Sequence, residues 1–346
     1  MTVHPQRILI VLHGSIGDVT RALPLANLMR RGYPKAKLVW AIEPLAFPLV
    51  EHHPAVDEVI LFDRNRWWRS LVPFLRRIRS QRFDLVLDLQ RHLKSGLISR
   101  WSGAPYRLGF HRRDAKELNW LFNNHTIAAV GEGISKLSHY LKFAEFLGIE
   151  PYPIEWGFRL TQQEEASVDK MLRGVGSHFV VFFVGSNWES KQWFSTQTAK
   201  SAAAIQEGYG MGIVLLGGKG DACFAQEVED FRPLRVTNLV GRTSLREAIG
   251  ILSRARVAIG PDTGLMHLCA AVGTAVVSLW GATDPIRTGP HGYQDLVIQG
   301  KAACSPCYLR RCPIGRICMQ SIDIEEVARK VGMVLSQKGK VHGARI

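Results

Sequence analysis

The chain has 346 residues, of which 46% are hydrophobic, a proportion that is ordinary for a globular protein. This length favours two domains over one, because single hydrophobic cores stop growing at roughly 250–300 residues. No apolar run reaches the ~20 residues that a transmembrane helix needs, and the N-terminal residues lack a signal-peptide pattern. We therefore expect a globular protein of the cytoplasm.

Positive charge is concentrated in one region of the sequence. The chain carries 44 Lys and Arg residues against 30 Asp and Glu residues, which gives a net charge of +14. Fourteen of the basic residues and three of the acidic ones lie between Arg64 and Lys116. Such a region is either a solvated face or a binding surface for an anionic lipid surface, an anionic sugar or phosphate ligand, or nucleic acid. Charge alone does not separate these alternatives.

The first half of the chain alternates between strand and helix signals. Its strands are apolar throughout rather than alternating between apolar and polar residues, which predicts a parallel sheet covered on both faces. The elements expected here are, in chain order, strand 8–12, helix 18–31, strand 37–42, helix 46–52, strand 58–63, helix 67–79, strand 84–89 and helix 94–101.

The second half repeats this α/β pattern after a linker at residues 151–158, a Pro-containing stretch without periodicity. After residue 320 we expect one amphipathic helix, because Val327, Val331 and Val334 recur at helical spacing. The other elements expected in this half are strand 178–185, helix 196–207, strand 212–218, helix 222–229, helix 244–253, strand 255–260, helix 264–271 and strand 275–281.

One carboxylate follows the first predicted strand. In the segment ILIVLHGSIGDVTRALP, which begins at Ile8, Asp18 comes after two glycines, where a helix should begin. An aspartate at a helix start is a good N-cap. Ligands in open α/β sheets bind at the carboxyl ends of the strands, so the same position also suits a functional side chain. The residues alone leave both interpretations open.

A second motif has the features of a phosphate-binding turn. In the segment AIGPDTGLMHLCAAVGTAVVSLWGATDP, a buried strand ends at Gly260 and a helix begins near Gly264. The N–H groups at a helix start lack intrahelical partners and favour an anion. Thr263 adds a hydroxyl group, and His267 follows one turn later. The alternative is that Asp262 only caps the helix and that His267 belongs to the core.

Three segments together resemble a known family. The turn motif above, the N-terminal segment around Asp18 and FDLVLDLQRHLKSGLIS (83–99) are similar to segments of the family 9 glycosyltransferases, the heptosyltransferases of lipopolysaccharide core assembly. The resemblance spans nearly the whole chain in the family's order. It implies an α/β protein of the GT-B fold, with two Rossmann-like domains facing each other across a cleft. The expected domains are 1–155, for the acceptor, and 165–320, for the nucleotide sugar, with helix 322–340 returning to the first.

The resemblance also implies roles for single residues. Asp18 is expected to be the base of an inverting transfer, with Gly17 keeping the loop open for the acceptor. A metal-independent site is expected for ADP-L-glycero-β-D-manno-heptose, because the chain has no Asp-x-Asp triplet and Lys191 would pair with the pyrophosphate. No cofactor is expected. The donor-binding residues expected from this resemblance are Ser186, Asn187, Lys191, Asp221, Asp262, Thr263, Gly264 and His267.

The same resemblance gives the basic region a ligand, the anionic inner core of lipopolysaccharide. Its expected acceptor-binding residues are Arg64, Lys94, Arg112 and Arg113, and we expect peripheral contact with the inner membrane surface. One alternative is a family 9 transferase that uses another nucleotide sugar. A more distant alternative is a nucleic-acid-binding protein, which we rank lower because the sequence shows no base-reading module.

Four cysteines form the pattern C-x2-C-x4-C-x5-C. Thiols at such spacing suit zinc, although the pattern is tighter than in common zinc modules. The alternative is a set of structural thiols in a compact loop, since disulfides are unlikely to persist in a reducing cytoplasm. A similar run occurs in the heptosyltransferase II-like branch of the family, and this favours that branch without settling the role of Cys304, Cys307, Cys312 and Cys318.

Overall fold

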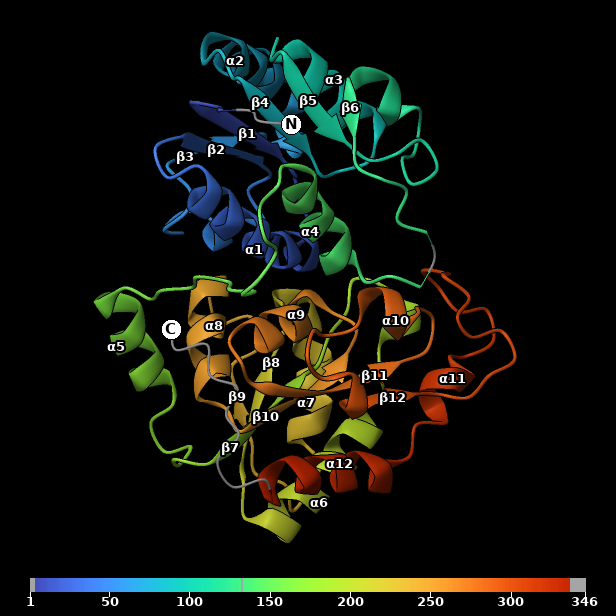
Figure 1. The fold of residues 1–346 in the computed structure, drawn as a ribbon. Helices are drawn as coiled ribbons and strands as arrows, with labels where there is room; N and C mark the ends of the chain where they lie inside the picture. Colours follow the sequence, from blue (N-terminus) through green and yellow to red (C-terminus); the bar gives the residue numbers. More distant parts are fainter. Residues whose placement is uncertain (1–3, 132, 337–346) are drawn as a thin grey trace. The chain divides into compact units, whose positions relative to one another are not determined.

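The computed structural model describes residues 4–131 and 133–336, and these form two compact α/β units that divide between Arg159 and Leu160 (Figure 1). The first unit contains β1 (Arg7–Val11), α1 (Ile16–Gly32), β2 (Lys37–Ile42), the 3₁₀ helix η1 (Phe47–Leu49), β3 (Glu58–Leu61), η2 (Arg64–Arg66), α2 (Trp67–Ser80), β4 (Leu85–Asp88), α3 (Leu93–Trp101), β5 (Tyr106–Gly109), η3 (Asn119–Phe122), β6 (His125–Thr126) and α4 (Lys136–Phe146).

The second unit has more short elements between its strands. It contains α5 (Gln162–Met171), β7 (Phe179–Phe183), η4 (Glu189–Lys191), α6 (Ser195–Tyr209), β8 (Gly212–Leu216), η5 (Lys219–Asp221), α7 (Ala222–Glu229), β9 (Thr237–Asn238), α8 (Leu245–Arg254), β10 (Val257–Pro261), α9 (Gly264–Ala271), β11 (Ala275–Trp280), α10 (Pro285–Thr288), η6 (Gln294–Leu296), β12 (Val297–Gln299), α11 (Ile317–Gln320) and α12 (Ile324–Ser336).

Each unit is built on a parallel sheet of six strands. The first sheet has the order β3-β2-β1-β4-β5-β6 and the second has the order β12-β11-β10-β7-β8-β9. Counted along the chain within each unit, both sheets follow the doubly wound order 3-2-1-4-5-6, in which ligands bind where the strand order reverses. That reversal lies between β1 and β4 in the first unit and between β7 and β10 in the second.

Helices cover both faces of each sheet, as the continuous apolar strands predicted. In β1, Leu9 and Val11 pack into a cluster with Phe74 and Ile78 of α2. The alternate residues Ile8 and Ile10 are equally buried, and α1 and α4 lie together on the other side of the sheet (Figure 1). Because successive strand residues point to opposite faces, only a strand with two covered faces is apolar at every position.

The final helix packs its apolar face within the second unit. The apolar face of α12 carries Val327 and Val331, both fully buried in the core cluster of the second unit. In that cluster α12 contacts α6, β10 and β11. The expected return of helix 322–340 to the first domain stays a prediction, and residues 337–340 lie outside the described part.

Some further elements depart from the sequence-based expectation. The helix expected over 46–52 is only the 3₁₀ turn η1, with Pro48 in its first turn. Strands β5 and β6 and helices α4 and α5 were not predicted. Both strands are short, and the charged helix α5 buries only Val168. The two strands and α5 therefore give no strong periodic signal in the sequence.

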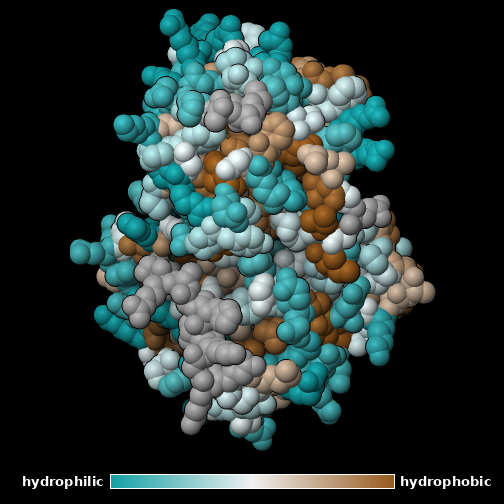
Figure 2. Space-filling view, in the orientation of Figure 1, coloured by the Kyte–Doolittle hydropathy of each residue, from teal (hydrophilic) through white to brown (hydrophobic). Residues whose placement is uncertain are grey.

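The surface in Figure 2 is mostly hydrophilic, with hydrophobic residues gathered in limited patches. None of the helices in the described ranges is long and apolar enough to cross a membrane. Several large apolar side chains of the first unit are nevertheless exposed on α2 and α3, among them Trp67, Leu97 and Trp101. These side chains line a cavity of the first unit.

Candidate active site

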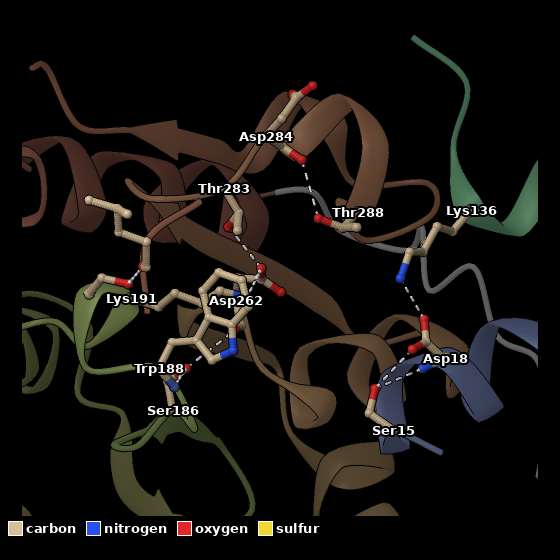
Figure 3. Close-up of polar contacts among 12 residues, drawn as sticks. Ser15, Asp18, Lys136, Ser186, Trp188, Lys191, Asp262, Thr283, Asp284 and Thr288 are labelled. Atoms are coloured by element: carbon tan, nitrogen blue, oxygen red, sulfur yellow. Dashed lines mark hydrogen bonds and ion pairs between the residues drawn. The ribbon is translucent and has the colours of Figure 1, made fainter. Parts of the chain in front are cut away.

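Asp18 lies in the first turn of α1, just beyond the carboxyl end of β1 (Figure 3). The N-cap of this helix is Ser15, whose Oγ accepts a hydrogen bond from the backbone N–H of Asp18 at 3.4 Å. The Ser15 hydroxyl also donates to Oδ2 of Asp18 at 3.3 Å. The capping role considered for Asp18 is therefore held by Ser15, and the Asp18 carboxylate is available for other contacts. Gly17 is buried beside it in the same turn.

Two cations hold the Asp18 carboxylate in its ionised form. Oδ1 contacts Arg21 Nη2 at 2.7 Å and Lys136 Nζ at 2.8 Å, and the Asp18 side chain is 22% exposed. Burial raises the pKa of Asp18, but Lys136 and Arg21 together lower it well below the usual range of an aspartate. The group is thus a proton acceptor that is ionised at neutral pH, with Oδ1 occupied by its cations and Oδ2 in contact only with Ser15 among the described partners.

Sequence reasoning missed both cations. Arg21 lies three residues after Asp18 on the same helix. Side chains at this spacing meet on a helix surface, so the sequence alone could have predicted this contact. Lys136 begins α4, 118 residues further along the chain. It reaches Asp18 because α1 and α4 pack side by side on one face of the first sheet. No local sequence pattern predicts a contact between residues so far apart in the chain.

A cavity of about 760 Å³ opens at the carboxyl ends of β1 to β4 in the first unit. Arg64 and Lys94, two of the expected acceptor-binding residues, line it. Arg112 and Arg113 are exposed in the turn after β5 and do not line this cavity. The structure therefore brings two of the four basic residues into one hollow and leaves the other two on the surface.

The second unit brings together residues from four of its segments around Asp262, directly after β10 (Figure 3). Oδ2 of Asp262 contacts Lys191 Nζ at 2.7 Å and accepts a hydrogen bond from the Thr283 hydroxyl at 2.8 Å. The Lys191 and Asp262 side chains are 15% and 10% exposed, so water screens their ion pair only weakly. Lys191 also lies over the Trp188 ring, 4.3 Å from its centroid. Sequence reasoning missed Thr283 and Trp188.

Helix α9 begins beside this ion pair, and no side-chain hydrogen bond among the described residues caps its N-terminus. Its N-cap is Thr263, whose side chain makes no capping hydrogen bond, and Gly264 is the first helical residue. The Thr263 hydroxyl is buried and has no hydrogen-bond partner among the described residues. His267 is buried one turn further on. Asp262 is therefore not the helix cap, and the first N–H groups of α9 together with the Thr263 hydroxyl remain available for an anion.

The loop after β7 carries the other expected donor contacts. The Ser186 Oγ accepts from the backbone N–H of Trp188 at 3.4 Å and points toward the backbone carbonyl of Asp262, at 3.5 Å. Asn187 is exposed on the same loop. The structure places Ser186 beside Asp262, whereas no side-chain contact of Asn187 with another described residue assigns it a role.

Asp221 stands at the end of η5, where it fixes a glycine-rich turn. Its Oδ2 accepts from the backbone N–H of Gly218 at 2.8 Å. A Cβ atom added at Gly185 would lie 2.1 Å from the Asp221 carboxylate, so only glycine allows this approach. Asp221 thus links the turn after β8 to the loop after β7, and its carboxylate is already engaged in the fold.

The segment with four cysteines supports the Lys191 loop from outside. Glu189, in η4, accepts a hydrogen bond from the backbone N–H of Cys312 at 2.9 Å and pairs with Arg316 at 3.0 Å. Ser190 donates through its backbone N–H to the carbonyl of Arg310 at 3.2 Å. These contacts fix the backbone on both sides of η4, and so they position Lys191.

All four cysteines of this segment are free thiols. Cys318 is buried, Cys307 and Cys312 are half-buried, and Cys304 is exposed. Burial raises the pKa of Cys318, and the neighbouring thiols of the segment add to the rise. Within 4–131 and 133–336, no three His, Cys, Asp or Glu side chains are grouped so that they would hold a metal ion.

Comparison with known proteins identifies the family. The model of glycosyltransferase family 9 (heptosyltransferase) matches residues 71–317. Lipopolysaccharide heptosyltransferase 1 of Pseudomonas aeruginosa is 29% identical over 322 residues, which cover 88% of this chain and 87% of that protein.

Two solved structures from Escherichia coli share the fold. One is ADP-heptose lps heptosyltransferase II, with a TM-score of 0.76, 20% identity and coverage of 95% of this chain and 98% of that chain. The other is heptosyltransferase WaaC with ADP, with a TM-score of 0.70, 23% identity and coverage of 94% and 99%. The expected α/β architecture of the GT-B class is thus confirmed. The chain belongs to glycosyltransferase family 9, and it is a glycosyltransferase.

Proposed function

We propose that this enzyme transfers a heptose from ADP-L-glycero-β-D-manno-heptose to the inner core of lipopolysaccharide, with inversion at the anomeric carbon and without a metal ion. Support for the sugar comes from the names of the relatives, which are heptosyltransferases of lipopolysaccharide, and from the E. coli neighbours named for ADP-heptose or solved with ADP. Support for the chemistry comes from the residues of the two units.

The uncapped start of α9 carries the donor part of this proposal. The buried Thr263 hydroxyl has no hydrogen-bond partner among the described residues, and the side chain of Thr263 does not cap the helix. Lys191 forms an ion pair with Asp262, the residue that precedes this turn. An unpaired buried hydroxyl costs about 1–3 kcal/mol, and a diphosphate bound there would satisfy it. We assign the diphosphate of the donor to this turn. Lys191, with three ammonium donors, then shares its charge between Asp262 and the phosphate.

Asp18 carries the acceptor part. The acceptor hydroxyl oxygen forms a bond to the anomeric carbon while the bond from that carbon to the phosphate oxygen breaks. The hydroxyl proton passes to the Asp18 carboxylate, and ADP leaves with the electron pair of the broken bond. Attack from the side opposite the leaving group inverts the anomeric centre. Arg21 and Lys136 orient the carboxylate and keep it ionised before the acceptor binds.

The basic residues of the first unit would hold the anionic acceptor. Arg64 and Lys94 are assigned to it because they line the cavity at the strand ends. Arg112 and Arg113, exposed after β5, are proposed to meet the outer part of the acceptor or the anionic surface of the inner membrane. Both contacts are electrostatic and should weaken as the salt concentration rises.

The donor assignment predicts selective stabilisation by ADP. At a concentration one hundred times its Kd, ADP should raise the free energy of unfolding by about 2.7 kcal/mol, and the melting temperature should rise accordingly. NAD, UDP and a DNA oligonucleotide should have little effect at equal concentration. Differential scanning fluorimetry provides the measurement. A response to UDP but not to ADP would point to another nucleotide sugar, and a response to NAD alone would refute the proposal.

The assignment of positive charge to Lys191 and the helix start predicts metal-independent turnover. These groups neutralise the charge that develops on ADP as it leaves, so no divalent ion is needed for that task. With the acceptor and ADP-heptose at saturation, EDTA should leave kcat nearly unchanged. The check is ADP release with and without EDTA, followed by addition of Mg²⁺. A large loss that Mg²⁺ restores would contradict the metal-free mechanism.

A further inference from the structure

His13, beside the cavity of the first unit, carries a buried polar atom without a partner among the described residues. His13 follows β1 and lines the cavity, and it is 7% exposed. Its Nε2 finds no hydrogen-bond partner among the described residues. The ring packs against Phe62 and Phe74, with centroids 5.7 and 6.1 Å away. Because leaving such a group unpaired opposes folding, its position in a cavity points to a ligand.

The polar end of the cavity also offers an unpaired cation. Lys94 lines the cavity and forms no ion pair with any described residue. The charge of Lys94 acts on both acids of the lining, Glu43 and Glu117, but neither forms an ion pair with it. Glu43 lies 3.9 Å from Arg64, and Glu117 contacts Nδ1 of His92 at 3.1 Å. Burial, Lys94 and Arg64 lower the pKa of His13 to about 4, so its ring is neutral at pH 7. A neutral imidazole beside an unpaired ammonium suits an anionic group.

The other end of the cavity is apolar and is formed by α2 and α3. Large apolar side chains stand open there: Trp67 is 56% exposed, Trp101 51% and Leu97 49%. The indole N–H of Trp101 donates to the carbonyl of Leu75 at 3.0 Å, which fastens the two helices to each other. Aromatic rings alone would also suit a sugar, but this wall includes aliphatic side chains, which favour a hydrocarbon chain. They are Leu71, Leu75, Leu97 and Ile98.

We propose that this cavity binds the acceptor as an amphiphile, with an anionic group at His13 and Lys94 and an acyl chain along the wall formed by α2 and α3. The inference rests on the proposed function in that the acceptor is an acylated lipid. It adds that the enzyme selects its acceptor by the acyl chain, and it makes His13 a residue that determines this specificity. The volume of about 760 Å³ falls in the range of small-molecule sites.

The first test measures binding of a simple anionic amphiphile to the full chain. Dodecyl phosphate, kept below its micelle concentration, is titrated by calorimetry, with inorganic phosphate as the head-only probe and octyl phosphate as the short-chain probe. Each methylene that leaves water tightens binding by roughly fourfold. We expect octyl phosphate to bind at least about tenfold more weakly than dodecyl phosphate, and inorganic phosphate more weakly still. Equal affinity of the two alkyl phosphates would overturn the proposal.

Two matched variants separate the cavity from adsorption to the surface. Leu97→Gln alters the cavity wall, whereas Val72→Gln alters α2 outside the cavity at a similar exposure, 51%. We expect Leu97→Gln to weaken dodecyl phosphate binding about fivefold or more and Val72→Gln to leave it unchanged. Equal weakening by both would mean that the helix binds lipid surfaces without a chain site, which contradicts the proposal.

The head-group contact is tested at His13. His13→Phe keeps a ring against Phe62 and Phe74 but removes both nitrogens, and we expect roughly tenfold weaker binding of dodecyl phosphate. His13→Gln, which retains polar atoms, should recover part of the affinity, and melting temperatures identify any loss of fold. Unchanged binding in His13→Phe would remove His13 from the site.

These binding results do not depend on catalysis. Transfer to a deacylated acceptor by the unaltered enzyme tests the proposed function separately. Absence of transfer would refute that function, while the alkyl phosphate titrations would still decide whether the cavity takes a chain.

Discussion

Asp18→Asn should lower kcat by about 10²-fold or more, because the amide keeps the size of the side chain but does not accept a proton. The Kd of ADP should remain close to that of the unaltered enzyme, since the residues assigned to the diphosphate belong to the second unit. The melting temperature should fall, because Arg21 and Lys136 lose their shared counter-charge. Steady-state kinetics, calorimetry with ADP and thermal unfolding measure the three quantities.

Asp57→Asn is the matched control for this substitution. Asp57 is a carboxylate of the same unit that pairs with Arg30 away from α1's first turn, so the control removes one ion pair and one negative charge. We expect a loss of stability with little change in kcat. If Asp18→Asn retains near-normal turnover while remaining folded, Asp18 has no part in the proton transfer. Because Ser15 is the helix cap, a fall in kcat is not explained by the loss of a cap.

Lys191→Met should weaken ADP binding and lower kcat together, the latter by roughly 10²–10³-fold, the range found when one group that stabilises developing charge is removed. The thioether keeps much of the side-chain length, but the positive charge is lost. Asp262, only 10% exposed, would then face the diphosphate without its counter-ion. The repulsion between carboxylate and phosphate adds to the loss of attraction.

The control for Lys191 is Lys200→Met on α6, an exposed lysine that makes the same change in net charge. It should leave the Kd of ADP and kcat unaltered. The two variants are compared by isothermal calorimetry with ADP and by initial rates at saturating donor. Normal ADP affinity in Lys191→Met would show that its ammonium serves only the ion pair with Asp262, and the diphosphate would then have to be placed elsewhere.

Several elements near the site were predictable from local sequence. Helix α9 begins at Gly264 and ends at Ala271, and strand β2 spans 37–42, both at the expected bounds. Both elements meet two conditions. Each has a clear pattern, either a continuous apolar run or helical periodicity, and each is bounded by a glycine or a polar residue. Where those conditions fail, as in the short strands β5 and β6, the elements escaped prediction.

The sequence by itself determined the class of fold, the positions of Asp18 and Lys191 at strand ends, and the glycine turn at the start of α9, since each depends on residues adjacent in the chain. Only the tertiary structure decided which groups meet: Lys136 with Asp18, and Thr283 with Asp262. It also placed the cysteine segment against η4 and left the Nε2 of His13, beside a cavity, without a partner in the described part of the chain. These contacts join segments far apart in the chain, and helix and sheet packing fix them; no local pattern encodes them.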